Sequence, residues 1–231
     1  MKIGIIGAMH SEVVTLKDAM ENKKTSTIAG MEYCEGKLDG VDVIVVQCGI
    51  GKVNAGICAQ VLINSFGAEC VVNTGVAGSL DARIDIGDIV VAVDAVQHDF
   101  DLTPWGYPPG KLAEVDVVAF PTDEKMRTAA VNAVKESFPE IHVFEGRVCT
   151  GDQFIASKKD KERIIETFNG ICCEMEGGSI AQVCYLNRVP FVIIRAISDK
   201  ADDSDEVAFF EFEEAAAKRC AGITRYIIKH L

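Results

Sequence analysis

Two stretches of sequence indicate how the chain folds: ICCEMEGGSIAQVC at residues 171–184 and RAISD at residues 195–199. The first stretch indicates a buried strand end carrying Glu174 and Glu176, then a Gly-Gly break, then a helix. The second follows an apolar run at residues 189–194 that is typical of a strand. Ligands of open α/β sheets bind outside the carboxyl ends of the strands. We therefore expect Glu174, Glu176 and Asp199 to lie at a functional site.

These carboxylates also have a simpler interpretation. Acidic residues often begin helices, because a negative charge is favoured at the positive end of the helix dipole. Two carboxylates flanking Met175, with a Ser-Asp pair ending the next strand, favour a site over this alternative.

Strand-like and helix-like patterns alternate along the whole chain. A first strand is predicted at residues 2–6, followed by a helix from near Ser11 that carries Glu12 in its first turn. Residues 27–38 and 41–47 are predicted to pair as a hairpin closed by Asp39-Gly40. Further strands are expected at 70–73, 87–96 and 142–150, and further helices at 52–66, 122–138 (capped by Thr122) and after Ser157. We predict a single α/β domain over residues 1–231 with a largely parallel sheet.

Three loop segments are candidates for ligand contact. The small residues of TGVAG at 74–78 let the backbone approach a ligand, although a plain tight turn explains them equally well. An aromatic segment at 97–112, which contains Trp105, is expected to be a lid or an interface. Phe154 is either an ordinary core residue or a flat surface on which a planar base stacks. The charged residues 200–206 are predicted to form a solvated turn.

Composition excludes several classes of function. The net charge of −12 opposes binding to nucleic acid or to an anionic membrane. The glycines form neither a GxGxxG fingerprint nor a Walker loop, and the four histidines form no HExxH motif, so neither a dinucleotide nor a metal is expected. Nine cysteines without CxxC spacing favour buried thiols in a reducing cytoplasm. No run reaches transmembrane length and no signal peptide is expected.

Motifs in order over essentially the whole chain carry a family resemblance: GIIGAM, GIGKVNA, NTGVAGSL, VQHDFDLTPWGY, TGDQFI, EMEGGSIA and RAISDKAD. The chain resembles the bacterial 5′-methylthioadenosine/S-adenosylhomocysteine nucleosidases of the nucleoside phosphorylase superfamily. The resemblance implies a three-layer α/β/α domain around a mixed, largely parallel twisted sheet, a cytoplasmic homodimer, and no cofactor. It implies release of adenine from a 5′-thio nucleoside, with roles in methionine salvage and in S-adenosylhomocysteine breakdown.

The resemblance also implies residue roles. Glu12 would activate the attacking water, Asp199 would protonate the purine N7, and Glu176 would bind the ribose hydroxyls. Trp105 of the partner subunit would cover the 5′-alkylthio group. The remaining expected substrate-binding residues are Ala8, Met9, Ile50, Val76, Ala77, Gly78, Phe154, Ile155, Glu174, Met175, Arg195, Ser198 and Phe209. Two departures from the family pattern are Val76, where many members have serine, and His10-Ser11, which replaces an acidic pair.

The chemistry of these residues agrees with that expectation. Cleaving an N-glycosidic bond builds positive charge on the sugar and negative charge on the base, which carboxylates and a proton donor would stabilise. Asp199 must then be protonated, and desolvation beside Glu12 and Glu176 is expected to raise its pKa. A phosphorylase would need arginines around its phosphate, and a non-catalytic binding protein would be expected to lack one of the three carboxylates. The sequence leaves methylthioadenosine, adenosylhomocysteine, 5′-deoxyadenosine and 6-amino-6-deoxyfutalosine open as substrates.

Overall fold

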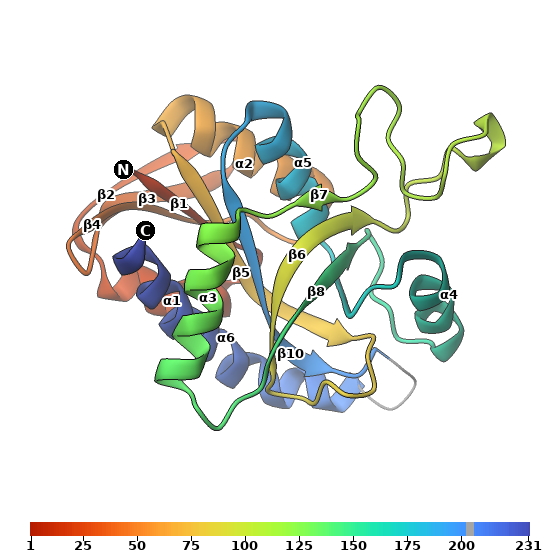
Figure 1. The fold of residues 1–231 in the computed structure, drawn as a ribbon. Helices are drawn as coiled ribbons and strands as arrows, with labels where there is room; N and C mark the ends of the chain where they lie inside the picture. Colours follow the sequence, from red (N-terminus) through yellow and green to blue (C-terminus); the bar gives the residue numbers. More distant parts are fainter. Residues whose placement is uncertain (202–205) are drawn as a thin grey trace.

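The computed structural model describes residues 1–201 and 206–231, with the backbone alone for 206–214 (Figure 1). Strands and helices alternate as expected. The strands are β1 (Ile3–Gly7), β2 (Glu21–Ile28), β3 (Met31–Leu38), β4 (Val41–Gln47), β5 (Cys70–Ser79), β6 (Ile89–Gln97), β7 (Phe120–Pro121), β8 (Val143–Thr150), β9 (Cys172–Glu174) and β10 (Phe191–Asp199). The helices are α1 (His10–Ala19), α2 (Lys52–Phe66), the short 3₁₀ helix η1 (Thr103–Trp105), α3 (Glu124–Ser137), α4 (Lys158–Phe168), α5 (Gly177–Asn187) and α6 (Glu206–His230).

The strands form one mixed sheet that closes on itself at one end. Strands β4, β1, β5 and β10 run parallel, as do β6, β8 and β9. Antiparallel pairings of β10 with β6 and of β5 with β9 join these two groups into a ring, while β2, β3 and β4 extend the sheet as antiparallel hairpins. The α/β fold class with a mixed sheet is confirmed.

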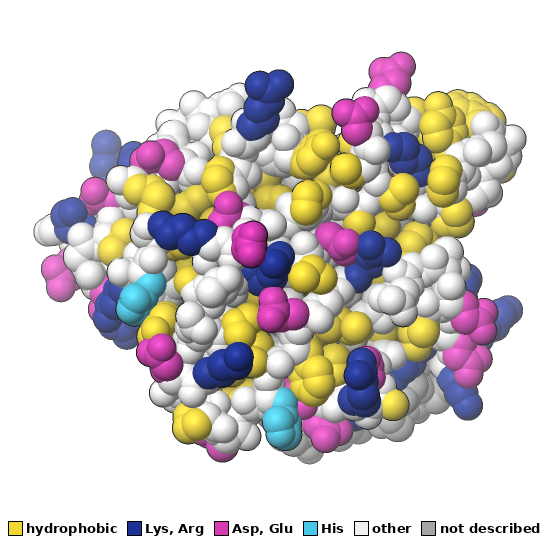
Figure 2. All heavy atoms as spheres, viewed as in Figure 1, with side chains coloured by type: hydrophobic (Ala, Val, Ile, Leu, Met, Phe, Trp, Pro, Cys, Tyr) yellow, Lys and Arg dark blue, Asp and Glu magenta, His cyan; other side chains and the backbone are white. Residues whose placement is uncertain are grey.

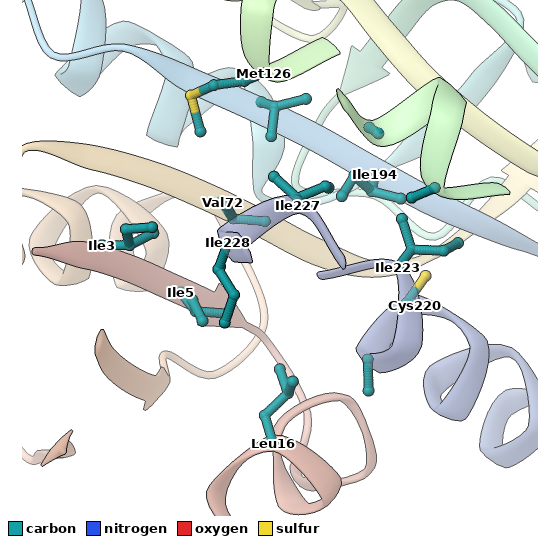
Figure 3. Close-up of a cluster of buried hydrophobic side chains, with 14 of the residues drawn as sticks. Ile3, Ile5, Leu16, Val72, Met126, Ile194, Cys220, Ile223, Ile227 and Ile228 are labelled. Atoms are coloured by element: carbon teal, nitrogen blue, oxygen red, sulfur yellow. The ribbon is translucent and has the colours of Figure 1, made fainter. Parts of the chain in front are cut away.

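Helices cover both faces of the central strands. Ile3 and Ile5 of β1 point to the layer formed by α1, α3 and α6, whereas Ile6 points to the layer formed by α2 and α5. This alternation is the two-residue side-chain period of a strand buried on both faces. Figure 3 shows the first core, where Leu16, Met126 and Ile223 from the three helices meet strand side chains. The sequence also predicts an apolar helical stripe near the C-terminus, formed by Phe212, Ala216, Cys220, Ile223 and Ile227, and the last four of these are buried.

Two local predictions were wrong in detail. Residues 27–38 are not one strand, because Ala29 and Gly30 both adopt positive φ and turn the chain between β2 and β3. The N-cap of α3 is Asp123, whose carboxylate accepts from the Met126 amide at 2.9 Å. Thr122 instead donates its hydroxyl to the Ala92 carbonyl of β6, at 2.6 Å. Ser157 caps α4 as expected, accepting from the Asp160 amide.

Strand β5 extends further than the sequence suggested. TGVAG is part of β5, so the tight-turn interpretation of this segment is wrong, whereas β10 ends at Asp199 as expected. The side chains of both strands are therefore held by a rigid sheet, which fixes catalytic geometry better than a loop does. The predicted turn at 200–206 falls largely outside the described residues, as do the side chains of Phe209 and Phe212.

The surface carries Lys, Arg, Asp and Glu intermixed over the face drawn in Figure 2. Hydrophobic side chains gather over the segment between β6 and β7, which projects from the body of the protein (Figures 1 and 2). Among the described residues, no helix is both long and apolar enough to cross a lipid bilayer.

Candidate active site

A cavity of about 600 Å³, including its open mouth, lies at the carboxyl ends of β1, β5 and β10. These strands are parallel neighbours, and the register pairs Ala196 with Val76 and Asp199 with Gly78. The ends of three strands thus converge on one crevice, as expected for an open α/β sheet.

The structure brings most of the predicted residues together around this cavity. Those that line it are Ala8, Met9, Glu12, Ile50, Val76, Ala77, Gly78, Phe154, Ile155, Glu174, Met175, Glu176, Ser198 and Asp199. Gln153 and Cys173 line it as well and were not predicted, although both are direct sequence neighbours of predicted residues. Arg195 lies behind the cavity wall, Trp105 lies on η1, and the side chain of Phe209 is outside the described part of the chain.

Glu12 is held in one orientation by the backbone. Its Oε2 accepts from the amides of Ala8 and Met9 at 2.6 and 2.9 Å, and its Oε1 accepts from the Val76 amide at 3.1 Å. A side chain at position 75 could not coexist with this arrangement, since a Cβ there would lie 2.4 Å from Oε1. Burial raises the pKa of Glu12. The hydrogen bonds from the three backbone amides and the positive charge of Arg195 oppose that rise. Glycine at position 75 therefore has a definite role, which is to let β5 contact this carboxylate.

Glu174 and Arg195 form a buried ion pair behind the cavity. The guanidinium donates to Glu174 Oε2 and, at 2.6 Å, to Asn73 Oδ1. Glu174 also accepts from the Thr150 hydroxyl and from the Gly177 amide. Burial alone would raise the pKa of Glu174, but the charge of Arg195 and these hydrogen bonds hold it below the ordinary value. Arg195 is thus already engaged by an ionised carboxylate.

Glu176 lines the cavity, and its surroundings disfavour its ionised form, in contrast to those of Glu174. Its Oε1 accepts from the Gly51 amide at 2.8 Å, and the residue is 7% exposed. Burial, followed by the negative charges of Glu174 and Glu12, raises the pKa of Glu176 to about 8. Arg195 and the Gly51 amide act in the opposite direction without cancelling the rise. The pKa values of Glu174 and Glu176, which flank Met175, are thus shifted in opposite directions, because Arg195 pairs with only one of them.

Asp199 ends β10 and lines the same cavity. Its Oδ2 accepts from the Ser198 hydroxyl at 2.9 Å, and its Oδ1 accepts from the Ala201 amide at 2.8 Å. Ala201 adopts a positive φ of 51°, which turns its amide back toward the carboxylate. Asp199 is 4% exposed, so its carboxyl group is shielded from bulk water and faces the cavity.

The remaining wall is apolar and partly open. Phe154 is 55% exposed at the mouth, whereas the neighbouring Ile155 is buried. A large aromatic ring exposed beside a cavity is a surface on which a planar ligand can stack. Of the two interpretations weighed for Phe154, the core interpretation is therefore wrong.

Neither departure from the family pattern disrupts the carboxylates. The side chain of Val76 packs against the hydrophobic core, while its amide still donates to Glu12. His10 is exposed at the start of α1. The described lining residues include no Lys or Arg, and the described part of the chain has no group of three or more His, Cys, Asp or Glu side chains suited to hold a metal. The arrangement can donate and accept protons around a small ligand that also contacts the apolar part of the cavity wall.

Comparison with known proteins places these observations in a family. A model described as "Phosphorylase superfamily" matches residues 2–229. The chain is 43% identical, over the full length of both proteins, to a 5′-methylthioadenosine/S-adenosylhomocysteine nucleosidase of Shewanella halifaxensis. A nucleosidase structure of that name from Neisseria meningitidis, in complex with methylthio-immucillin-A, superposes with a TM-score of 0.96 at 36% identity, covering 100% of this chain and 99% of the other. A futalosine hydrolase of Helicobacter pylori superposes with a TM-score of 0.95 at 33% identity, covering 100% and 98%.

Proposed function

We propose a function for this chain, which belongs to the 5′-methylthioadenosine/S-adenosylhomocysteine nucleosidase family of the phosphorylase superfamily. The proposed reaction is hydrolysis of the N-glycosidic bond of 5′-methylthioadenosine and of S-adenosylhomocysteine. The products are adenine and the 5-thio-ribose sugar. 5′-Deoxyadenosine and 6-amino-6-deoxyfutalosine are further candidate substrates, since they share adenine and ribose and differ only at the 5′ end.

One observation carries this proposal. The carboxyl groups of Glu12, Glu176 and Asp199 face a single cavity whose described lining residues include no Lys or Arg. Such a cavity stabilises a sugar that becomes positively charged and can supply a proton to the departing base. It is poorly suited to a phosphate co-substrate, which calls for bidentate arginine contacts.

Glu12 is the proposed base that activates water. A carboxylate has about four lone-pair sites, and the backbone amides of Ala8, Met9 and Val76 occupy three of them. The open site is on Oε1, beside β5. A water bound there would be oriented by a carboxylate that cannot rotate, which is the geometric requirement for general-base catalysis.

Asp199 is the proposed acid that delivers a proton to N7 of adenine. It lines the same cavity as Glu12, and its neighbours Ser198 and Ala201 donate hydrogen bonds to its two oxygens. Glu176 is the proposed acceptor for the ribose hydroxyls, with Met175 packed on the sugar. General acid catalysis of this kind is worth about 10²–10⁴ in rate.

The segment after β8 is the proposed adenine site. Phe154 would stack on the base while the backbone of Ile155 meets its hydrogen-bonding edge. The other proposed substrate contacts are Ala8, Met9, Ile50, Val76, Ala77, Gly78, Glu174, Ser198 and Phe209, while Arg195 behind the cavity wall would orient the acidic residues.

We also propose a homodimer in which Trp105 of one subunit covers the 5′ pocket of the other. Trp105 is 75% exposed. Helices α2 and α5 pack side by side and expose Val53, Ile57 and Leu186, and the cavity residue Ile50, three residues before Val53, is exposed as well. Adjacent exposed apolar residues of this kind mark an interaction surface.

A cytoplasmic location is proposed from the thiols. All nine cysteines lie within the described residues, and each is a free, buried thiol. Free thiols are typical of a reducing compartment.

The test is release of adenine from the four candidate substrates in phosphate-free buffer, compared as kcat/KM. Release from the two thio-nucleosides supports the proposal. Absence of release from all four would contradict it, and release from aminodeoxyfutalosine alone would reassign the substrate.

A further inference from the structure

Three segments that line or flank the cavity meet at a closed ring of contacts, here called the Lys52 ring, formed by Lys52, Asp99 and Asp152. The Lys52 ammonium donates to Asp99 Oδ1 at 2.6 Å. Asp99 Oδ2 accepts from the Asp152 amide at 2.9 Å, and Asp152 Oδ1 accepts from the Lys52 amide at 2.7 Å. Each residue thus contacts both of the others.

The ion pair within the ring is largely buried. The side chains of Lys52 and Asp99 are 17% and 16% exposed. Burial would raise the pKa of Asp99, but the bonds from Lys52 and from the Asp152 amide hold it below the ordinary value. Lys52 also donates to Gln97 Oε1 at 3.2 Å. A pair this shielded is expected to hold its geometry, unlike the exposed pairs that contribute little.

Every member of the ring is adjacent to a part of the proposed site. Lys52 follows Gly51, whose amide donates to Glu176 Oε1. The Lys52 carbonyl accepts from the Ser179 hydroxyl of α5, three residues after Glu176, at 2.6 Å. Asp152 precedes the segment of Phe154 and Ile155, which lines the cavity. Asp99 begins the projecting segment that carries Trp105.

The two loops that carry Lys52 and Asp152 are closely packed at the Lys52 ring. Gly51 has a φ of +100°, and a Cβ there would lie 3.1 Å from Asp152 Oδ1. Gly151 packs so closely on the His98 imidazole that a Cβ would come within 2.4 Å of Nε2. Displacing either segment would therefore require the other to move, because the two loops are in direct contact.

We propose that Lys52 is a positioning residue of the nucleosidase, which through its ring with Asp99 and Asp152 holds the Gly51 amide against Glu176 and fixes the purine-stacking segment at residues 153–155. This inference rests on the proposed function for its catalytic consequence. The organisation of the two loops stands apart from that function and is measured separately.

The perturbation is Lys52→Met, which keeps the aliphatic stem and removes the charge. The unpaired Asp99 carboxylate then stays desolvated. Lys37→Met is the matched control, since it removes an exposed pair with Asp42 on the β3–β4 hairpin. The double variant Lys52→Met/Asp99→Asn tests rescue, because the amide oxygen still accepts from the Asp152 amide while no charge is left unpaired.

The first measurement is hydrogen–deuterium exchange by mass spectrometry on the ligand-free protein. We expect Lys52→Met to exchange faster at residues 49–54 and 151–155, with the rest of the sheet unchanged, and the double variant to recover protection in part. Unchanged exchange in both segments would overturn the proposal whatever the enzyme's substrate.

The second measurement is the pH profile of adenine release. We expect kcat/KM to fall at least about tenfold, toward the ~10² that a displacement of about 1 Å costs. Any step of the profile that reports ionisation of Glu176 should also move to higher pH, because Glu176 loses its Gly51 hydrogen bond while Glu174, Glu12 and Arg195 around it are unchanged. A lower active fraction with KM and the pH profile unchanged would reveal a merely structural role and overturn the proposal. A wild-type protein that releases no adenine would instead refute the proposed function, leaving the exchange result to decide the role of the ring.

Discussion

Replacing Glu176 by glutamine should stabilise the folded protein at alkaline pH. The amide oxygen keeps the contact with the Gly51 amide, while the charge that Glu174 and Glu12 oppose is removed. The pKa of Glu176 rises from 4.5 to about 8 on folding, and each pH unit corresponds to 1.36 kcal/mol. Ionised Glu176 therefore costs the folded state about 5 kcal/mol, with little water screening because the residue is 7% exposed.

The sign follows from proton linkage. Between pH 4.5 and 8 the unfolded chain loses the Glu176 proton while the folded protein keeps it, so stability falls as pH rises. The free-energy cost of ionising Glu176 in the folded protein is absent below pH 4.5 and fully present above pH 8. The variant should match wild type near pH 4.5 and exceed it increasingly toward pH 9.

The assay is urea unfolding of both proteins at pH 5, 7 and 9 in the ligand-free state. Glu162→Gln, which changes an exposed carboxylate on α4, serves as the control and should show no pH-dependent difference. A difference between Glu176→Gln and wild type that stays constant from pH 5 to 9 would refute the reasoning. The stabilised variant should also have a raised KM, because an amide is a weaker acceptor for ribose hydroxyls.

Three further substitutions test the proposed roles. Asp199→Asn should lower kcat by at least about 10² while leaving the affinity for a non-hydrolysable analogue largely intact, since the amide keeps the shape but delivers no proton; retention of more than about a tenth of kcat would remove Asp199 as the acid. Glu12→Gln should abolish adenine release in both phosphate-containing and phosphate-free buffer, and activity restored by phosphate would contradict its role toward water. Trp105→Ala should reduce kcat/KM for 5′-thioether substrates more than for 5′-deoxyadenosine, and equal losses would place Trp105 outside the pocket. Sedimentation of wild type should show a dimer, and a single 25 kDa species at micromolar concentration would contradict the shared pocket.

Much of the fold could be predicted because hydrophobic patterns are local. The hairpin at Asp39-Gly40 is one example, since both residues adopt the positive φ that this turn requires. The exact ends of the strands and helices were harder to predict. Ala29 gives no signal that it will turn the chain, and Thr122 and Asp123 are both good N-caps, so only the packing of β6 against Thr122 decides between them.

The site was predicted mainly through its carboxylates and through the family resemblance. The sequence could not show which of the carboxylates is ion-paired and which has a raised pKa. Glu174 and Glu176 are separated by one residue, yet only the fold places Arg195 on the first and leaves the second with a pKa of about 8. The Lys52 ring was missed for the same reason, since its members lie 47 and 100 residues apart along the chain.

The nucleophile that attacks the sugar, water or phosphate, distinguishes a hydrolase from a phosphorylase. Phosphate about 4 Å from ionised Glu12 would meet a repulsion of around 4 kcal/mol at an effective dielectric of 20, and Arg195 is already paired with Glu174. The measurement is chromatography of the products from 5′-methylthioadenosine at increasing phosphate concentration. We expect adenine and free 5-methylthioribose, at a rate independent of phosphate. A sugar 1-phosphate product, or a rate that saturates with phosphate, would contradict it.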